Sequence, residues 1–285
     1  MAHSADSLHV HATTDGYCYL HGERLTVAGF QQFPEEVVGG YHTFEQGVIF
    51  FDAITDAEIV AEEFIAVQGE VKNCTLRSKG DILLQNAENC IIVTAGTVYV
   101  DGDLINCDIK TRQKVVGSPY SRIMGGTVRA FREITAGSVG TSDFIETTLE
   151  VGNDHYTPLR DIEIEQEMVG CNYNILRIQS ALKPFSSSAA HRNLTDERRA
   201  LIQQIQSHQK VQEDRIRLLR EEKRRNVLLT KERVTATITV VETHPGVWIR
   251  NGRLQLLVET PMQHVQFVEA QRGTTLLAVP LENAT

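Results

Sequence analysis

The stretch "NCTLRSKGDILLQNAE", residues 73–88, is followed by "NCIIVTAGTVYVDGDLI", residues 89–105, and then by "NCDIKTRQKVVG" from residue 106. An Asn-Cys pair therefore returns three times along the chain. Recurring cysteines of this kind can be metal ligands, redox groups or equivalent positions in a structural repeat. The first two interpretations predict an enzyme, whereas the third predicts a scaffold.

Aligning the three Asn-Cys pairs places Leu76, Ile92 and Ile109 at one position, and each has another aliphatic residue six positions later. The same spacing occurs before them in "AEIVAEEFIAVQG" and after them in "GGTVRAFREITAG". Five copies result, separated by steps of 17, 16, 17 and 19 residues. A near-constant period of this length is typical of a solenoid, whose units bury their apolar faces by stacking on their neighbours.

The units are too short to hold a strand and a helix each, and they are rich in Val, Ile and Thr. They predict a β-solenoid, a single-stranded β-helix whose coils stack about 4.8 Å apart. Thiols spaced along a line in this way do not converge on one ion, so we expect no metal site and no cofactor. We expect a ladder of buried structural residues: Cys74, Cys90, Cys107, Leu76, Ile92 and Ile109.

From residue 155 the pattern changes to that of a helix with an apolar seam at spacings of 4, 3, 4, 3 and 4. The seam residues are Ile164, Met168, Cys171, Ile175, Ile178 and Leu182. The stretch "KPFSSSAAHRN", residues 183–193, interrupts the pattern, and a second helix is predicted to start near Asn193 or Thr195 and to continue to about Glu232. Two long helices joined by a short turn predict an antiparallel coiled-coil hairpin.

The second helix contains a net basic stretch, "RIRLLREEKRRN", residues 215–226. One interpretation is a solvated helix face with salt bridges. The other is a docking surface for an acidic partner or an anionic lipid surface. The candidate docking residues are Arg215, Arg217, Arg220, Lys223, Arg224 and Arg225.

The last fifty residues return to a strand pattern, with a Pro-Gly turn and an Asn251–Gly252 hairpin signal. We expect these strands to form a small C-terminal β element that packs at the solenoid base. The predicted organisation is an N-terminal segment with short strands at residues 1–53, the solenoid at 54–152, the helical hairpin at 153–233 and the C-terminal strands at 234–285.

The composition narrows the classes of function. The chain has 285 residues, is 41% hydrophobic and carries a formal net charge of -9, which argues against a general nucleic-acid binder. No apolar run approaches the roughly 18 residues that a membrane-spanning helix needs. Five cysteines without a CxxC motif fit reduced thiols in the cytoplasm. The sequence contains none of the common nucleophile, phosphate-loop or zinc-helix motifs, so we expect no catalytic residues and no enzyme activity.

Three phrases resemble the flagellar assembly protein A family of bacteria: "IMGGTVRAFREITAGSVGT", "TTLEVGND" and "HPGVWIRNGRLQLLVE". The family motif positions are Gly125, Gly126, Gly152, Pro245 and Gly246. The resemblance implies a right-handed β-solenoid with a helical hairpin. Many members also carry a sizeable N-terminal domain, whereas about fifty residues precede the first predicted coil here.

Two functional hypotheses follow. The first is a non-enzymatic scaffold in flagellar or polar assembly, which presents the hairpin to another protein and can self-associate through its solenoid ends. It would act in the cytoplasm, at the cell pole or at the membrane. The second is a solenoid that binds or modifies cell-wall carbohydrate. Aromatic residues make up only 6% of the chain, with Trp248 as the single tryptophan, and this favours the scaffold.

Overall fold

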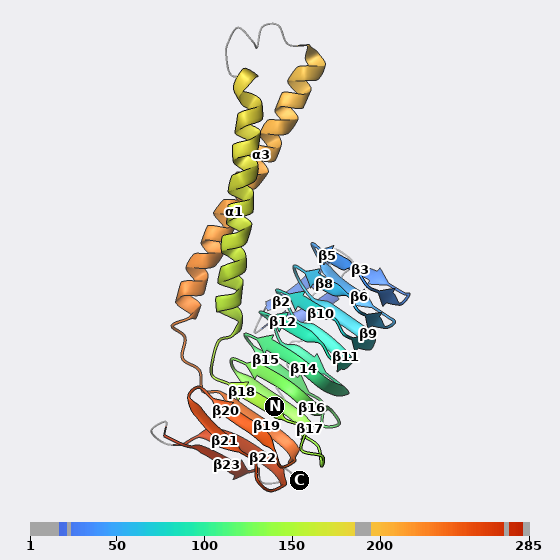
Figure 1. Ribbon diagram of the computed structural model, residues 1–285, viewed down its shortest axis with the longest axis vertical. Helices are drawn as coiled ribbons and strands as arrows, with labels where there is room; N and C mark the ends of the chain where they lie inside the picture. The colour runs from blue at the N-terminus through green and yellow to red at the C-terminus, as the bar shows by residue number, and fades with distance from the viewer. Residues whose placement is uncertain (1–16, 22–23, 186–194, 271–273, 282–285) are drawn as a thin grey trace, which may run out of the picture. The chain divides into compact units, whose positions relative to one another are not determined.

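The computed structural model describes residues 17–21, 24–185, 195–270 and 274–281. It divides into two compact units. The first comprises the chain before and after the helices, Met1–His155 with Val234–Thr285, and the second is the helical segment Tyr156–Arg233. Figure 1 labels the elements of both units.

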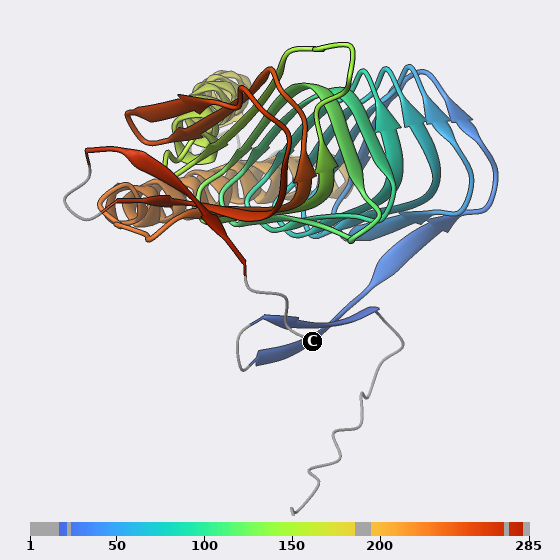
Figure 2. The same ribbon diagram turned by 90° about the horizontal axis from the view of Figure 1, so that it is seen from below.

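The first unit is a β-solenoid of about seven turns, as the sequence predicts, and its strands stack in parallel rows. Figure 2 shows the successive coils one behind another. One row contains β5 (Tyr41–Phe44), β8 (Glu58–Ala61), β10 (Thr75–Ser78), β12 (Ile91–Thr94), the end of β14 (Asp103–Thr111), the end of β16 (Arg122–Ala130), β18 (Thr147–Val151) and β20 (Val247–Asn251).

A second row contains β3 (Phe30–Phe33), β6 (Gly47–Phe50), the start of β9 (Ile65–Lys72), the start of β11 (Ile82–Glu88), β13 (Val98–Val100), β15 (Lys114–Gly117), the start of β17 (Glu133–Val139) and the start of β19 (Thr237–Thr243). The third row begins with β4 (Val37–Val38) and β7 (Ile54–Thr55) and continues through the remaining ends of the longer strands. The coil is therefore three-sided, with one parallel row on each side.

The strand register reproduces the alignment of the sequence repeat. Leu76 pairs with Ile59 on one side and with Ile92 on the other, and Ile92 pairs with Ile109. These four side chains have an exposed fraction of 0%. Each would expose its apolar surface in an isolated coil, so stacking supplies the stabilising burial.

The solenoid begins earlier than residue 54, the predicted boundary. Strands β3, β4 and β5 already pair in parallel with β6, β7 and β8. The repeat position that holds Ile59 in the next coil is occupied by His42. Because the aliphatic signal is missing there, the spacing of the sequence does not reveal this coil. Before it, β1 (Tyr17–His21) and β2 (Arg24–Ala28) form a separate antiparallel sheet.

The helical segment interrupts a solenoid coil at a corner between two rows. Six residues separate Val128 from Ile134, whereas eighty-nine separate the equivalent residues Leu149 and Ile238. After the helices, β19 pairs in parallel with β17, and β20 pairs in parallel with β18. The prediction that residues 234–285 form an element at the solenoid base therefore needs correction, because the first two of these strands complete the solenoid itself.

Only the last strands form a separate element. β21 (Leu254–Leu257) pairs antiparallel with β20, β22 (Met262–Glu269) pairs antiparallel with β19, and β23 (Leu276–Pro280) pairs with β22. They cover the edges of the last coil. Among the described strands, an open parallel edge remains at the other end, where β3, β4 and β5 pair on one side only. The two ends of the solenoid therefore differ, since one carries antiparallel strands and the other presents a parallel edge.

The second unit contains α1 (Tyr156–Leu182), the short 3-10 helix η1 (Lys183–Phe185) and α3 (Asp196–Leu229). Thr195 caps α3, and its hydroxyl accepts a hydrogen bond from the backbone N–H of Arg198 at 3.4 Å. Both helices lie close to their predicted bounds, although most of the predicted break at 183–193 falls outside the described residues. Neither helix of the described chain is long and apolar enough to cross a membrane.

Candidate functional site

The Asn-Cys repeat forms one corner of the solenoid. Asn73, Asn89 and Asn106 have φ values of 53°, 54° and 51°, which lie in the left-handed region that asparagine tolerates better than most residues. The Asn106 amide donates a hydrogen bond to the Asn89 side-chain oxygen at 2.8 Å. The Asn73 amide donates to Asp56, the left-handed residue of the preceding coil, at 3.1 Å. The asparagines thus have a structural role at a stacked turn.

Cys74, Cys90 and Cys107 follow these corners and are 1–2% exposed. Each sulfur lies 3.0–3.4 Å from the carbonyl oxygen of the residue two positions before it, to which the thiol can donate. Contact with the Cys107 thiol and burial raise the pKa of Cys90 to about 11, and contact with Cys90 and burial raise the pKa of Cys74 above its usual range. The hydrogen bond with Cys90 lowers the pKa of Cys107.

Protonated thiols such as Cys74 and Cys90 are poor ligands and poor nucleophiles at neutral pH. Across the described residues, no group of three or more His, Cys, Asp or Glu side chains is placed to hold a metal ion. The arrangement of the three cysteines suits packing, together with the buried aliphatic row of Leu76, Ile92 and Ile109.

The Gly125–Gly126 step occupies the same corner one coil further on. Gly126 pairs with Cys107 in the strand register, so Gly125 takes the position of the asparagines and Gly126 that of the cysteines. Both have positive φ values, 74° and 77°. A Cβ on Gly126 would lie 2.3 Å from the carbonyl oxygen of Cys107, which is closer than real Cβ contacts. Two glycines are therefore required where this corner changes its conformation.

The other motif glycines lie at turns beside the helical insertion. Gly152, with φ 83°, follows β18, and its Cβ would meet the Asn251 side chain at 2.5 Å. Gly246, with φ 89°, follows Pro245 in the turn before β20 and donates its N–H to the carbonyl of Val258 at 2.9 Å. Gly152 lies at the turn where the chain leaves β18 for the helices, and Gly246 lies at the corner between β19 and β20.

A buried polar cluster lies where the chain leaves β18. The Glu150 carboxylate is 2.7 Å from His155 Nε2, accepts a hydrogen bond from Asn153 at 2.8 Å and lies 3.6 Å from the Arg129 guanidinium. The hydrogen bond with His155, supported by Asn153 and Arg129 against the effect of burial, lowers the pKa of Glu150 to about 2. Spacing alone did not reveal this cluster, because its residues have no periodic pattern.

A second ion pair supports the same segment. Arg112 lies 3.3 Å from the Asp154 carboxylate, and both side chains are less than a tenth exposed. The Arg112 guanidinium also lies 5.5 Å from the centre of the Phe131 ring. These contacts fix residues 150–155 at the point where the solenoid strand ends.

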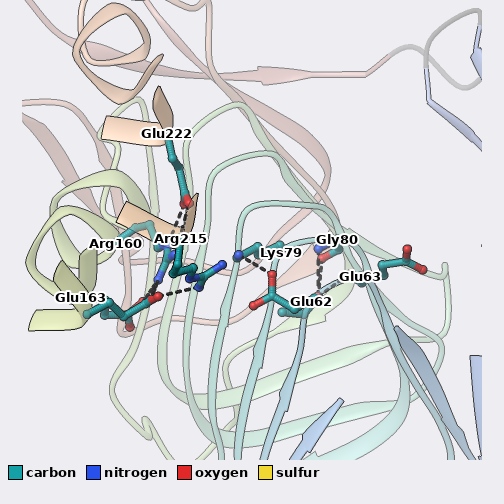
Figure 3. A network of polar contacts seen from close by, with 10 residues as sticks. Glu62, Glu63, Lys79, Gly80, Arg160, Glu163, Arg215 and Glu222 are labelled. Atoms are coloured by element: carbon teal, nitrogen blue, oxygen red, sulfur yellow. Dashed lines mark hydrogen bonds and ion pairs between the residues drawn. The ribbon is translucent and has the colours of Figure 1, made fainter. Parts of the chain in front are cut away.

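Within the helical unit, Arg160 is the centre of an ion-pair network (Figure 3). Its guanidinium donates to Glu222 of α3 at 2.7 Å, and to Glu167 and Glu163 of its own helix at 2.8 Å and 3.1 Å. The Arg160 side chain is 7% exposed. Burial opposes its charge, but the pairs with Glu222 and Glu167 outweigh burial and raise the pKa of Arg160.

Further polar contacts join the two helices. Glu167 pairs with Arg215, Glu165 pairs with Lys223, and Asp161 accepts a hydrogen bond from the Asn226 amide at 2.6 Å. Burial acts against ionisation of Glu167, but Arg160 and Arg215 hold its pKa below the usual value. The glutamates of α1 therefore pair either with a residue of α3 or with Arg160, which itself contacts α3.

The six candidate docking residues divide into two groups. Arg215 and Lys223 face α1 and form the ion pairs just described, and Arg217 pairs with Asp214 of its own helix at 3.0 Å. Arg220, Arg224 and Arg225 are exposed, and no ion pair between described residues involves them. The sequence stretch is therefore partly a structural ion-pair face and partly a free basic face.

The predicted apolar seam of α1 coincides with its less exposed positions. Ile164 is fully buried, and the five later seam residues are intermediate in exposure while most of their neighbours are exposed. Near the C-terminal end of α1, an open groove of about 430 Å³ lies between the helices. It is lined by residues that include Ile178 of α1 and Ile205, His208 and Gln212 of α3. Two of the α3 residues that line this groove, His208 and Gln212, are polar.

A comparison with protein families gives a match to the model of the flagellar assembly protein A beta solenoid domain over residues 45–274. The chain belongs to this family. The match spans the solenoid from β6 onward, the helical insertion and the strands that resume the solenoid after it, while β3, β4 and β5 precede it. No curated protein and no solved structure matches the chain.

Membership in the flagellar assembly protein A family confirms the resemblance of the three phrases and associates the chain with flagellar assembly. The family motif glycines lie at the corner and junction turns described above. The exposed arginines of α3 and the residues that define the solenoid corners belong to different units of the chain.

Proposed function

We propose that this member of the flagellar assembly protein A family is a non-enzymatic scaffold, whose helices form a coiled-coil hairpin that binds an acidic partner protein. The ion pairs support an antiparallel hairpin, because the partners of Arg160 and Glu167 are Glu222 and Arg215. Residue numbers therefore rise along α1 as they fall along α3. The proposal includes no catalytic step, cofactor or nucleic acid.

The observation that carries the docking role is the exposed group of Arg220, Arg224 and Arg225. Arg220 and Arg224 stand four residues apart on one helix face, and like charges at this spacing destabilise a helix by a few tenths of a kcal/mol, roughly 0.2–0.5. The inner basic residues stabilise the helix pair through glutamates, whereas these three arginines do not. An acidic partner surface would relieve their repulsion and favour association.

The carbohydrate hypothesis has less support. Sugar-binding solenoids stack aromatic side chains along one face, but the exposed Tyr99 pairs with Leu83 and Val116 in the strand register. Trp248 is only partly exposed. The proposed place of action is the cytoplasm, at the cell pole or at the membrane.

The test is a triple charge reversal, Arg220→Glu, Arg224→Glu and Arg225→Glu, placed in a flagellated host in which the variant replaces the resident gene. A matched control reverses three other exposed basic residues of α3, Arg198, Arg199 and Lys210, and changes the net charge equally. We expect the first variant to reduce swimming and the number of flagella, and the control to retain both. Equal behaviour of the two variants, with equal helix content, would contradict docking through this face.

A further inference from the structure

The α1 helix carries a second row of apolar residues, on the side opposite its inner seam. These residues, called the outer α1 stripe below, are Leu159, Ile162, Val169, Tyr173 and Leu176. They are separated by 3, 7, 4 and 3 residues, so a rotation of 100° per residue gathers them on one helix face. Their exposed fractions range from 37% to 67%.

An exposed stripe of this kind differs from isolated surface aliphatic residues, which are common. Contiguous exposed apolar surface marks an interaction site in a soluble protein. The corresponding outer positions of α3 are different, because Asp214, Glu221 and Arg225 interrupt its exposed aliphatic residues. The α1 stripe is interrupted once, by the exposed Glu165 and Gln166 between Ile162 and Val169, and it holds more apolar residues on one face than α3 does.

Gly170 supplies an independent indication that another helix approaches this face. It lies in the middle of α1, next to Val169, and is exposed. A Cβ built at this position would meet nothing within 4 Å, so contacts within the chain do not require glycine. Glycine inside a helix is unfavourable, and its common use is to allow close approach of another backbone.

We infer that a second copy of this chain covers the outer α1 stripe, with the two α1 helices packed antiparallel about a twofold axis. The spacing is self-complementary in this orientation. Leu159 lies opposite Leu176 of the second copy, Ile162 lies opposite Tyr173, and the axis passes between the levels of residues 166 and 169. Gly170 then lies near the level of the axis, on the flank of the stripe that also carries Arg177, where a missing side chain leaves room for the second helix.

Charge complementarity supports a second copy as the occupant. Glu163 and Arg177 flank the same side of the stripe, and an antiparallel twofold brings Glu163 of each copy toward Arg177 of the other. Glu163 also pairs with Arg160 of its own chain at 3.1 Å, so its carboxylate would be shared between the two arginines. The Arg177 guanidinium already lies 5.8 Å from the centre of the Tyr173 ring, at the edge of the stripe. On the opposite flank, Glu165 is paired with Lys223 of its own chain, which limits repulsion between the two copies.

This interface is on a different helix from the arginine face proposed for the partner protein. Its failure would leave the docking role standing, because the docking test reads flagellar assembly and the present test reads oligomeric state. The interface does not depend on the solenoid ends either.

The first experiment measures the mass of the full chain by sedimentation equilibrium from low to high micromolar concentration, under reducing conditions. We expect a reversible dimer. Val169→Glu introduces a charge at the centre of the stripe and is expected to weaken dimerisation about tenfold or more. The matched control is Val211→Glu on α3, whose valine is 61% exposed against 67% for Val169, and it should leave the dimer unchanged. Circular dichroism should give the same helix content for all three proteins.

The second experiment tests the register. Glu163→Arg and Arg177→Glu should each weaken the dimer, because each places like charges together, and combining both in one chain should restore it. Because Glu163 also pairs with Arg160 of its own chain, the variants are compared at equal helix content and equal melting temperature of the helical circular dichroism signal. A wild-type chain that stays monomeric at the highest concentration overturns the inference. A dimer that Val169→Glu and Val211→Glu weaken equally also overturns it. Failure of the combined charge swap to restore a Val169-sensitive dimer overturns the antiparallel register.

Discussion

The solenoid and the helix pair use different residues at their internal contacts. The solenoid column contains stacked aliphatic side chains and buried cysteines, and its row from Ile59 to Ile109 is fully buried. The contact between α1 and α3 also contains buried Ile164 and Leu219, but it includes Arg160 and Asn226 as well. The solenoid is therefore held by shape and burial, whereas the helix pair adds charged groups that specify which residues face each other.

The difference has an energetic basis. A fully buried aliphatic side chain contributes about 1.5–3 kcal/mol, and every coil adds several of them. Ion pairs contribute less to stability, but removing one partner of a buried pair is costly because the other charge loses its compensation. We expect packing changes to be most damaging in the solenoid and charge changes to be most damaging in the helix pair.

The largest effect is expected for Ile92→Ala in the buried row. The substitution leaves a cavity in a column that is packed on both sides, so the free energy of unfolding should fall by about 3 kcal/mol. The neighbouring Ile91 is 44% exposed, and Ile91→Ala should change it by less than about 1 kcal/mol. Chemical denaturation of both variants measures the difference, and similar losses would show that the column is not the main source of stability.

The next effect concerns the charged centre of the helix pair. Arg160→Met keeps most of the side-chain volume but leaves Glu222, Glu163 and Glu167 without their shared cation. Because these carboxylates are partly exposed, the expected loss is about 2 kcal/mol rather than the full cost of a buried unpaired charge. Thermal unfolding followed by the helical circular dichroism signal measures it. Arg199→Met, in an exposed pair with Asp196, is the control and should have little effect.

Alanine substitutions at two glycines with positive φ distinguish the cost of a steric clash from the cost of backbone strain. Gly126→Ala meets both a positive φ and the carbonyl oxygen of Cys107, so it should cost about 2 kcal/mol or more. Gly39→Ala has a similar φ of 70°, but nothing lies within 4 Å of its Cβ. Its cost should be close to 1 kcal/mol, the strain alone. Equal urea midpoints for the two variants would contradict the close contact.

The smallest effect depends on pH and tests the junction cluster. The pKa of Glu150 is lowered from 4.5 to about 2, so the charged form stabilises the folded state above the unfolded pKa. This contribution is lost as the pH falls from about 4.5 to about 2. Glu150→Gln should therefore be less stable than the wild type at neutral pH, by about 1–2 kcal/mol, and the gap should close across this acidic window. If the difference in unfolding free energy between the wild type and Glu150→Gln stays constant with pH, the hydrogen bonds of Glu150 and not its charge account for the loss of stability.

Much of the fold could be predicted from periodicity. The spacing of Leu76, Ile92 and Ile109 predicted a stacked row, since a residue can recur at this period and stay apolar only if it occupies equivalent places in successive coils. The heptad of α1 and the cap at Thr195 likewise predicted the helices nearly to their bounds. The coil containing His42 was missed because one polar residue removed the signal.

The candidate site was less accessible from the sequence. The stretch from Arg215 to Arg225 could be recognised as basic, but its division into paired and free residues depends on which side of α3 faces α1. The junction residues Glu150, His155 and Arg129 come from different strands and loops, so only the folded chain brings them together. The outer α1 stripe was not identified from the sequence, because its exposure depends on which side of α1 the second helix covers.

The sequence by itself determined the repeating unit, the helical segment and the family, because period and local preference depend on residues close together in the chain. Tertiary structure decided that the strands after the helices return to the solenoid, where β19 pairs with β17 across the insertion. It also decided which charges are paired. The return of the strands to the solenoid and the pairing of charges between the helices depend on contacts between residues many tens of positions apart. Such contacts leave no regular spacing in the sequence.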